Sequence, residues 1–339
     1  MRVIAAALAL FVLQSTPVPA LRVPAELDRY LTKYVGLTPA QRADLLAGRA
    51  VTKLLDADPA KEVAVFGALW IAAPMASYVA AARDIERLES GDNFIVTKKI
   101  SDRPTIDDFS QLRVPDDDAE DLRTCKVGQC QIKLPQSAIE RVRREVNWSK
   151  SPRTDLDRIA RELALDYVKG YLAGGNDQLA VYRDADRPTF VATEFRSMID
   201  RLPSLAEFLP DLKRYLLQFP QASLPNSESF LYWQQAKFGL KPTVRINHVV
   251  IVQEADHVVV ASKMLYASHY FWTALEVRVL LADPARGNGF WFVTVSRSRS
   301  DGLSGFVGRV IRGKVRDEAE KGIAAVLAST RARLESIRQ

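Results

Sequence analysis

The sequence predicts an α+β fold in which a curved antiparallel sheet is gripped by a long C-terminal helix. In the last third of the chain, residues 243–253, 257–282 and 289–300 are rich in β-branched and aromatic residues and are separated by short polar turns. Residues 307–337 then carry apolar side chains at helical spacing. A sheet with an apolar face must bury that face, and a long amphipathic helix can cover it.

The first twenty residues have the pattern of a cleaved export signal. Met1 and Arg2 give a short positive start, residues 3–13 are uninterrupted apolar, and Val18 and Ala20 are small residues before a cleavage site. The apolar run is too short to span a bilayer comfortably. We therefore expect the protein to be exported, to a periplasm or to the extracellular space. An uncleaved anchor or a buried N-terminal helix is the alternative.

The composition is that of an ordinary globular protein and excludes disordered and multispanning membrane proteins. Of 339 residues, 47% are hydrophobic and 26% are charged, and no later segment approaches the length of a membrane span. The net charge of +6 is spread along the chain. It indicates a solvated surface, with peripheral contact with an anionic membrane surface as the alternative. The chain lacks a concentrated basic patch, so we expect no nucleic-acid partner.

The part of the chain that follows the signal is predicted to alternate between helix and strand. Thr38 is a suitable helix cap with Pro39 at the first helical position. Pro74 ends an apolar, β-rich run. The expected elements are a helix over 25–37, a second helix from Thr38 to Val51, a strand over 62–73, a helix over 77–88 and a strand over 93–100.

The middle of the chain is predicted to be mostly helical. Residues 136–146 and 153–172 have amphipathic spacing, and Gly174 and Gly175 end the second helix. Residues 194–219 form a further helical stretch that prolines interrupt. We therefore expect an N-terminal helical segment over 21–60 and one α+β domain over 61–339, with a helical insertion at about 136–219.

Cys125 and Cys130 are the two cysteines of the chain. Their flanks, 122–124 and 131–134, are β-like, and Gly128 lies in the turn between them. Cysteines at both ends of such a turn face each other, and an exported protein meets oxidising conditions, so we expect a disulfide. The spacing fits neither haem attachment nor a zinc site, and we expect no cofactor.

The order of the predicted elements resembles that of the START-type, or helix-grip, lipid-transfer superfamily. Residues 62–73 correspond to its first strand, 77–88 to the following helix, 230–300 to the main sheet and 307–337 to the gripping helix. The helical block at 136–219 departs from this order and has to be an insertion. The resemblance implies a hydrophobic ligand or lipid held between the sheet and the C-terminal helix.

Several aromatic residues of the predicted sheet are candidates for a ligand cavity. Tyr266, Tyr270 and Trp272 share one face of the expected strand, whereas His269 lies on the other, and Trp291 adds to the aromatic set. Core packing is the simple interpretation. The functional one is the wall of an apolar cavity, in which tyrosine hydroxyls and a histidine supply the few polar points.

Two arginines follow on the last strand. Arg297 and Arg299 point to one face, where they could hold a carboxylate or phosphate; surface or salt-bridged arginines are the alternative.

The sequence predicts no metal site. His248, His257 and His269 are too far apart along the predicted strands to converge on one ion. The acidic run at 116–121 lacks the glycine and glutamate that a calcium loop needs, and we expect a solvated loop there.

Two functions follow from these observations. The first is an exported binding or carrier protein for a hydrophobic small molecule or lipid, with the candidate ligand-binding residues Tyr266, His269, Tyr270, Trp272, Trp291, Arg297 and Arg299. The second is a hydrolase or cyclase-like enzyme on a hydrophobic substrate, with His269 as general base oriented by Asp301 or Glu276. A structural partner in envelope assembly is a third interpretation.

Overall fold

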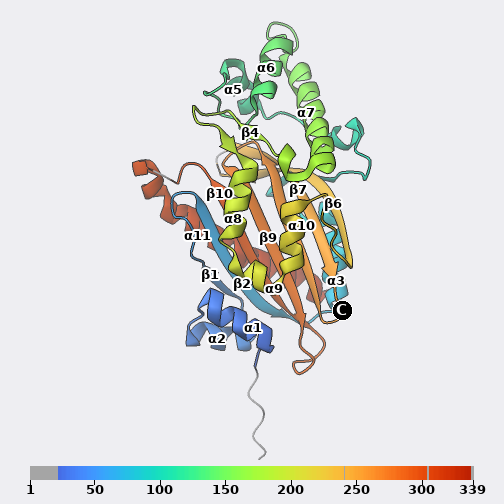
Figure 1. The fold of residues 1–339 in the computed structure, drawn as a ribbon, viewed down its shortest axis with the longest axis vertical. Coiled ribbons are helices and arrows are strands. Elements are labelled where there is room, and N and C mark those ends of the chain that lie inside the picture. Colours follow the sequence, from blue (N-terminus) through green and yellow to red (C-terminus); the bar gives the residue numbers. More distant parts are fainter. Residues whose placement is uncertain (1–21, 240, 304, 337–339) are drawn as a thin grey trace, which may run out of the picture.

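A twisted antiparallel sheet forms the centre of the molecule (Figure 1). The computed structural model describes residues 22–336 except 240 and 304, so the predicted export signal lies outside the described residues. The eight strands are hydrogen-bonded in the order β1-β2-β10-β9-β8-β7-β6-β3. Their bounds are β1 Val51–Leu54, β2 Glu62–Ile71, β3 Phe94–Lys99, β6 Ser227–Phe238, β7 Lys241–Gln253, β8 His257–Ala267, β9 Phe271–Ala282 and β10 Phe290–Ser300.

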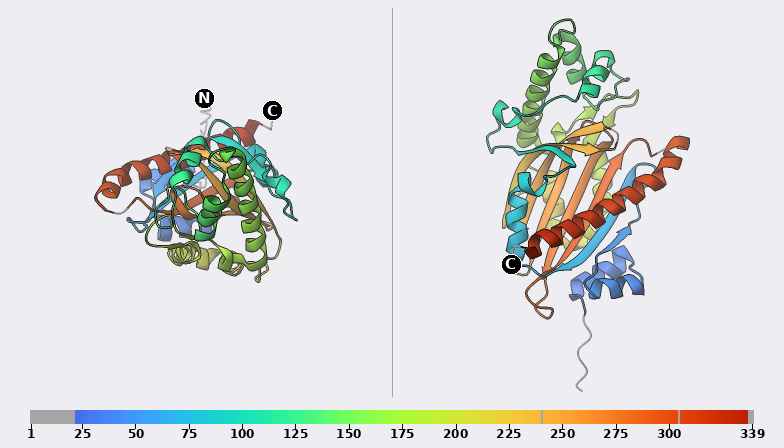
Figure 2. Two further views of the ribbon diagram at one scale, coloured as in Figure 1. Left: turned by 90° about the horizontal axis from the view of Figure 1, so that it is seen from above. Right: turned by 180° about the vertical axis from the view of Figure 1, so that it is seen from behind.

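The long C-terminal helix α11 (Gly305–Ser336) crosses one face of this sheet (Figure 2). It packs on β2 and β1, and α3 (Met75–Arg83) and α4 (Ile85–Leu88) cover more of the same face. Gly67 of β2 permits the close approach, because a Cβ atom there would lie 2.5 Å from Cγ2 of Ile323. The predicted α+β fold with a gripping helix is therefore confirmed.

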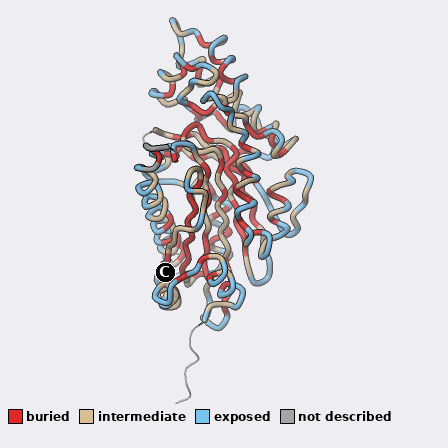
Figure 3. The backbone as a smooth tube through the Cα atoms, turned by 60° about the vertical axis from the view of Figure 1, so that its left-hand side comes forward, coloured by how far each residue is buried: buried red, intermediate tan, exposed pale blue. Residues whose placement is uncertain are grey.

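The opposite face is covered by two groups of helices. Over the middle of the sheet lie α8 (Val191–Asp200), α9 (Pro203–Phe208) and α10 (Pro210–Gln218), which begin and end near the prolines that the sequence placed at breaks. Over β2 and β10 lies the N-terminal segment, with α1 (Ala25–Tyr30) and α2 (Pro39–Leu46). Coverage of both faces leaves the central strands mostly buried (Figure 3).

The described part of the N-terminal segment, residues 22–60, packs on the main domain. Leu27 and Leu31 are buried against Phe66 of β2 and Trp291 of β10. The expected second helix is shorter than predicted: it ends at Leu46, Gly48 has a positive φ, and Val51 begins strand β1 instead.

Beyond one end of the sheet, three helices form an arm (Figure 1). They are α5 (Asp116–Thr124), α6 (Gln136–Glu145) and α7 (Pro152–Gly174), and Gly175 with a positive φ follows α7 as expected. A short two-stranded ribbon, β4 (Val181–Tyr182) and β5 (Thr189–Phe190), leads back to α8. We refer to residues 116–174 as the arm.

The arm includes two corrections to the sequence predictions. The acidic run at 116–121 is the start of α5 and not a solvated loop, because acidic side chains are favourable in the first turn of a helix. Residues 122–124 end this helix and do not form a hairpin strand, although Lys126 and Gln129 make one isolated bridge. The predicted disulfide between Cys125 and Cys130 is present, with an S–S distance of 2.07 Å.

No helix within the described residues combines the length and apolar character needed to cross a membrane.

A buried lysine, which has no carboxylate partner among the residues that the structure describes, lies under α7 and α8. The side chain of Lys263 is fully buried, its Nζ donates to Oδ1 of Asn176, and it lies 4.3 Å from the ring centre of Phe195. The neighbouring His248 is hydrogen-bonded through Nδ1 to the Tyr171 hydroxyl at 2.9 Å. Burial lowers the pKa of Lys263 to about 7. Burial, together with the charge of Lys263, lowers the pKa of His248 to about 3.

Replacement of this lysine should make the protein more stable at neutral pH. The unfolded chain binds a proton at Lys263 up to about pH 10.5 and the folded chain only up to about pH 7, so the lysine destabilises the fold below pH 10.5. Lys263→Met should raise the free energy of unfolding at pH 7 by on the order of 1 kcal/mol. This gain should shrink towards pH 10 in denaturant titrations.

The exposed Lys321 provides the matched control, because Lys321→Met changes the same side chain on the surface of α11. A gain at Lys263 that does not depend on pH would contradict the lowered pKa.

Candidate functional site

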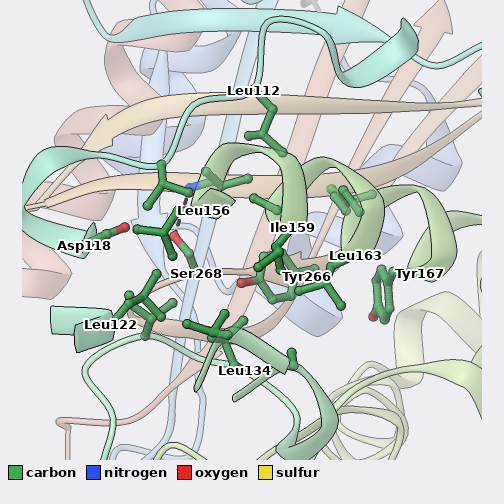
Figure 4. A pocket seen from close by; sticks show the side chains of 18 of the residues that line it. Leu112, Asp118, Leu122, Leu134, Leu156, Ile159, Leu163, Tyr167, Tyr266 and Ser268 are labelled. Carbon is green, nitrogen blue, oxygen red and sulfur yellow. Dashed lines mark hydrogen bonds between the residues drawn. The ribbon is translucent and has the colours of Figure 1, made fainter. Parts of the chain in front are cut away.

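An apolar cavity of about 160 Å³ lies between the arm and the end of the sheet (Figure 4). Helices α5, α6 and α7 form one side of it, and β6, β7 and β8 form the other. The arm contributes mainly apolar side chains, among them Leu122, Leu134, Leu156, Ile159 and Leu163. The sheet contributes Trp233, Val244, Ile246 and Tyr266.

The helical spacing of the arm explains both the apolar walls and the space between them. On α7, Leu156, Ile159 and Leu163 recur at intervals of three and four residues and therefore share one face. Ala160 and Ala164 lie on the same lining, where a larger side chain would fill the cavity. Alanines at these positions leave room between the arm and the sheet.

Among the described residues of the cavity wall, Asp118, Tyr167, Tyr266 and Ser268 carry polar groups, as do Trp233 through its indole N–H and the exposed Arg113. The Tyr167 hydroxyl donates to the Leu265 carbonyl at 2.7 Å and accepts from the Ala180 amide. Burial raises the pKa of both tyrosines well above the usual value, and the charge of Asp118 contributes at Tyr266. Both phenols therefore remain protonated at neutral pH.

Asp118 forms a buried pair with His269. Nε2 of His269 lies 2.9 and 3.1 Å from the two carboxylate oxygens, and both residues are at most 5% exposed. Asp118 lies in the first turn of α5, where a carboxylate also gains from the helix dipole. The pair ties the arm to the turn between β8 and β9.

The role of Asp118 in the cavity wall was not predicted from the sequence, because an aspartate in an acidic run is expected to be solvated. A signal was available, since Ala119 and Leu122 give the run a partly apolar helical face.

Of the seven predicted ligand-binding residues, all of which the structure describes, Tyr266 lines this cavity. His269 lies behind the wall, bound to Asp118. The chain turns at residues 268–270, so the predicted strand faces do not continue past Ala267. Tyr270 has a positive φ and its hydroxyl accepts from the Lys241 amide at 2.8 Å. Trp272 is partly buried beside Lys61.

The remaining predicted residues lie on β10, away from this cavity. Trp291 is buried against the N-terminal helices and donates through Nε1 to Asp283 at 2.9 Å. Arg297 pairs with the buried Glu62, and Arg299 lies 3.2 Å from the Glu194 carboxylate. The two arginines therefore occupy internal ion pairs, which is the alternative that the sequence left open.

The interface between the sheet and α11, where the resemblance placed a ligand, contains packed side chains. Leu69 and Phe292 of the sheet meet Ile323 and Leu327 of the helix in one core. Glu276, one predicted partner of His269, lies on this face and binds Arg278 with two hydrogen bonds. The other predicted partner, Asp301, pairs with Lys133.

A second cavity, of about 150 Å³, lies under the N-terminal segment. Helices α1 and α9 and strands β8, β9 and β10 line it. Glu207, the residue before Phe208 of this lining, binds Lys33 at 2.6 Å and also accepts a hydrogen bond from Tyr34. Its lining is mostly apolar, and Glu26, Ser204 and His257 are its polar members along with Tyr30.

Within the described part of the chain, no three histidine, cysteine, aspartate or glutamate side chains lie close enough to hold a metal ion.

No protein-family model matches the chain, and no curated protein is significantly similar to it.

Loss of the Asp118 carboxylate should destabilise the protein. Asp118→Ala leaves a buried histidine without its partner, which should lower the free energy of unfolding by about 1–3 kcal/mol. Asp117→Ala removes an exposed carboxylate from the same helical turn and should change stability by less than about 0.5 kcal/mol. Denaturant titrations of both variants test this, and equal effects would show that the pair contributes nothing.

Proposed function

We propose that this protein is an exported binding or carrier protein for a compact hydrophobic molecule, held in the cavity between the arm and the sheet. The observation that carries the proposal is a cavity of about 160 Å³ whose walls are mostly aliphatic and aromatic, with a few polar groups. Sites for small apolar molecules have this composition. Burial of apolar surface, at about 25 cal/mol per Å², would drive binding.

The volume limits what fits. An apolar cavity of about 150 Å³ accommodates benzene. The ligand should therefore be a molecule with a single ring or a short chain, or a longer molecule whose end enters the cavity. A complete long-chain lipid would have to extend out of it.

Export and family membership are part of the same proposal. A disulfide is typical of proteins in oxidising compartments, and residues 1–20 have the pattern of an export signal. The sheet with its gripping helix is compatible with the START-type superfamily. We propose that the ligand is shifted from the interface of sheet and helix to the arm, because core side chains fill that interface.

A second candidate function is an enzyme, and the Asp118–His269 pair favours it. Asp118 lies in the cavity wall and His269 orients it at 2.9 Å, so the carboxylate and not the imidazole would meet a substrate. Such an enzyme should lose turnover in Asp118→Asn, whereas a carrier should lose at most some affinity.

A filled cavity should abolish binding while the fold persists. Ala160→Leu places three more carbon atoms in the cavity, whereas Ala80→Leu makes the same change at an exposed position of α3. Native mass spectrometry with solvent extraction should find a bound apolar molecule in the original protein and in Ala80→Leu. It should find at least tenfold less in Ala160→Leu.

Retention of the same molecule by Ala160→Leu would place the binding site elsewhere. The second cavity would then be the next one to test, with Ser204→Phe.

A further inference from the structure

Some polar groups of the arm cavity have hydrogen-bond partners within the protein, whereas others do not. Tyr167 makes two hydrogen bonds, and Nε1 of Trp233 donates to the Asp108 carbonyl at 2.8 Å. Arg113 is half exposed at the rim, where its guanidinium donates to backbone carbonyls and lies near Asp157. These groups therefore do not require a hydrogen-bond partner on a ligand.

The Tyr266 hydroxyl is different, because it makes no hydrogen bond to any residue that the structure describes. Tyr266 is also only partly buried, and its side chain lines the cavity. Figure 4 shows its oxygen on the side of the cavity where Asp118 and Ser268 also lie. A phenol in an apolar wall without a partner is a hydrogen-bonding site that a ligand can complete.

The neighbouring groups supply the complementary half of a hydrogen-bonding pair. The Asp118 carboxylate uses part of its accepting capacity on His269 and can accept further hydrogen bonds. The Ser268 oxygen already accepts from the Val244 amide at 3.0 Å. The same wall thus offers a donor, the Tyr266 hydroxyl, and an acceptor, the Asp118 carboxylate.

We propose that the cavity selects a compact neutral alcohol or phenol, whose hydroxyl accepts a hydrogen bond from Tyr266 and donates one to Asp118. This inference rests on the proposed binding function and specifies its ligand class. A hydroxyl is both donor and acceptor and therefore satisfies both groups. The apolar remainder of the ligand lies against the leucine and isoleucine side chains of the arm.

Other ligand classes fit this wall less well. A hydrocarbon leaves the Tyr266 hydroxyl unpaired. A carboxylate brings a second negative charge close to Asp118, and Arg297 and Arg299, the predicted anion-binding residues, are held in ion pairs on β10. An ammonium group uses the acceptor but has nothing to receive the Tyr266 proton, and its charge must be desolvated.

Four single-ring probes with the same ethyl group separate these classes: 4-ethylphenol, ethylbenzene, 4-ethylbenzoate and 4-ethylbenzylammonium. Isothermal titration calorimetry at pH 7 on the mature protein should give the highest affinity for 4-ethylphenol. Its advantage over ethylbenzene should be at least about fivefold, the net effect of the hydrogen bonds with Tyr266 and Asp118. The two ions should bind more weakly than ethylbenzene.

Tyr266→Phe should reduce the preference for 4-ethylphenol over ethylbenzene, because the ligand hydroxyl then keeps only its hydrogen bond to Asp118. The control is Tyr182→Phe, because Tyr182 packs beside Tyr266 with ring centres 6.1 Å apart but does not line the cavity. The control should keep the preference for 4-ethylphenol.

The outcomes separate this inference from the proposed function. Binding of ethylbenzene as tightly as 4-ethylphenol would overturn the selection of alcohols and phenols, and so would binding of either ion more tightly than 4-ethylphenol. Both results would still support the cavity as a binding site. An undiminished preference for 4-ethylphenol in Tyr266→Phe would also overturn it. Failure of all four probes to bind would count against the cavity as a binding site altogether.

Discussion

Burial of both faces of one antiparallel sheet is the constraint on which the rest of the structure depends. Strand β2 alternates between two cores: Val65 and Leu69 face α11, whereas Phe66 and Ala68 face the N-terminal helices. The apolar side chains of both faces must be buried, and helices from several parts of the chain cover them. The N-terminal segment, α8 to α10 and α11 each bury a different part of the sheet.

The arm cavity follows from the same constraint. At the end of β7 and β8 the sheet extends beyond α8 to α10, and the arm takes over the role of cover. Helix α7 has alanines between larger side chains in the cavity wall. The small alanine side chains leave a space between the arm and the sheet. Ligand pockets occur preferentially at such junctions between packed units.

The interior also contains polar groups that the core has to accommodate. Arg297 and Glu62 are paired, whereas Lys263 has hydrogen-bond partners but no carboxylate among the described residues. Such groups are costly to bury, and pairing reduces the cost more than hydrogen bonding alone. The Asp118–His269 pair belongs to this class, but it lies in a cavity wall, where a ligand can reach the carboxylate.

The sequence by itself determined the elements, because periodicity, prolines and glycines act locally: the strands of the last third, the C-terminal helix, the breaks before Pro203 and Pro210, and the Cys125–Cys130 disulfide. The tertiary structure decided which residues line the candidate site. The turn at 268–270 separates Tyr266 from Tyr270 and Trp272, and Asp118 meets His269 across 151 positions of sequence. Contacts at such separations depend on how the arm docks on the sheet, and no local pattern in the sequence encodes that geometry.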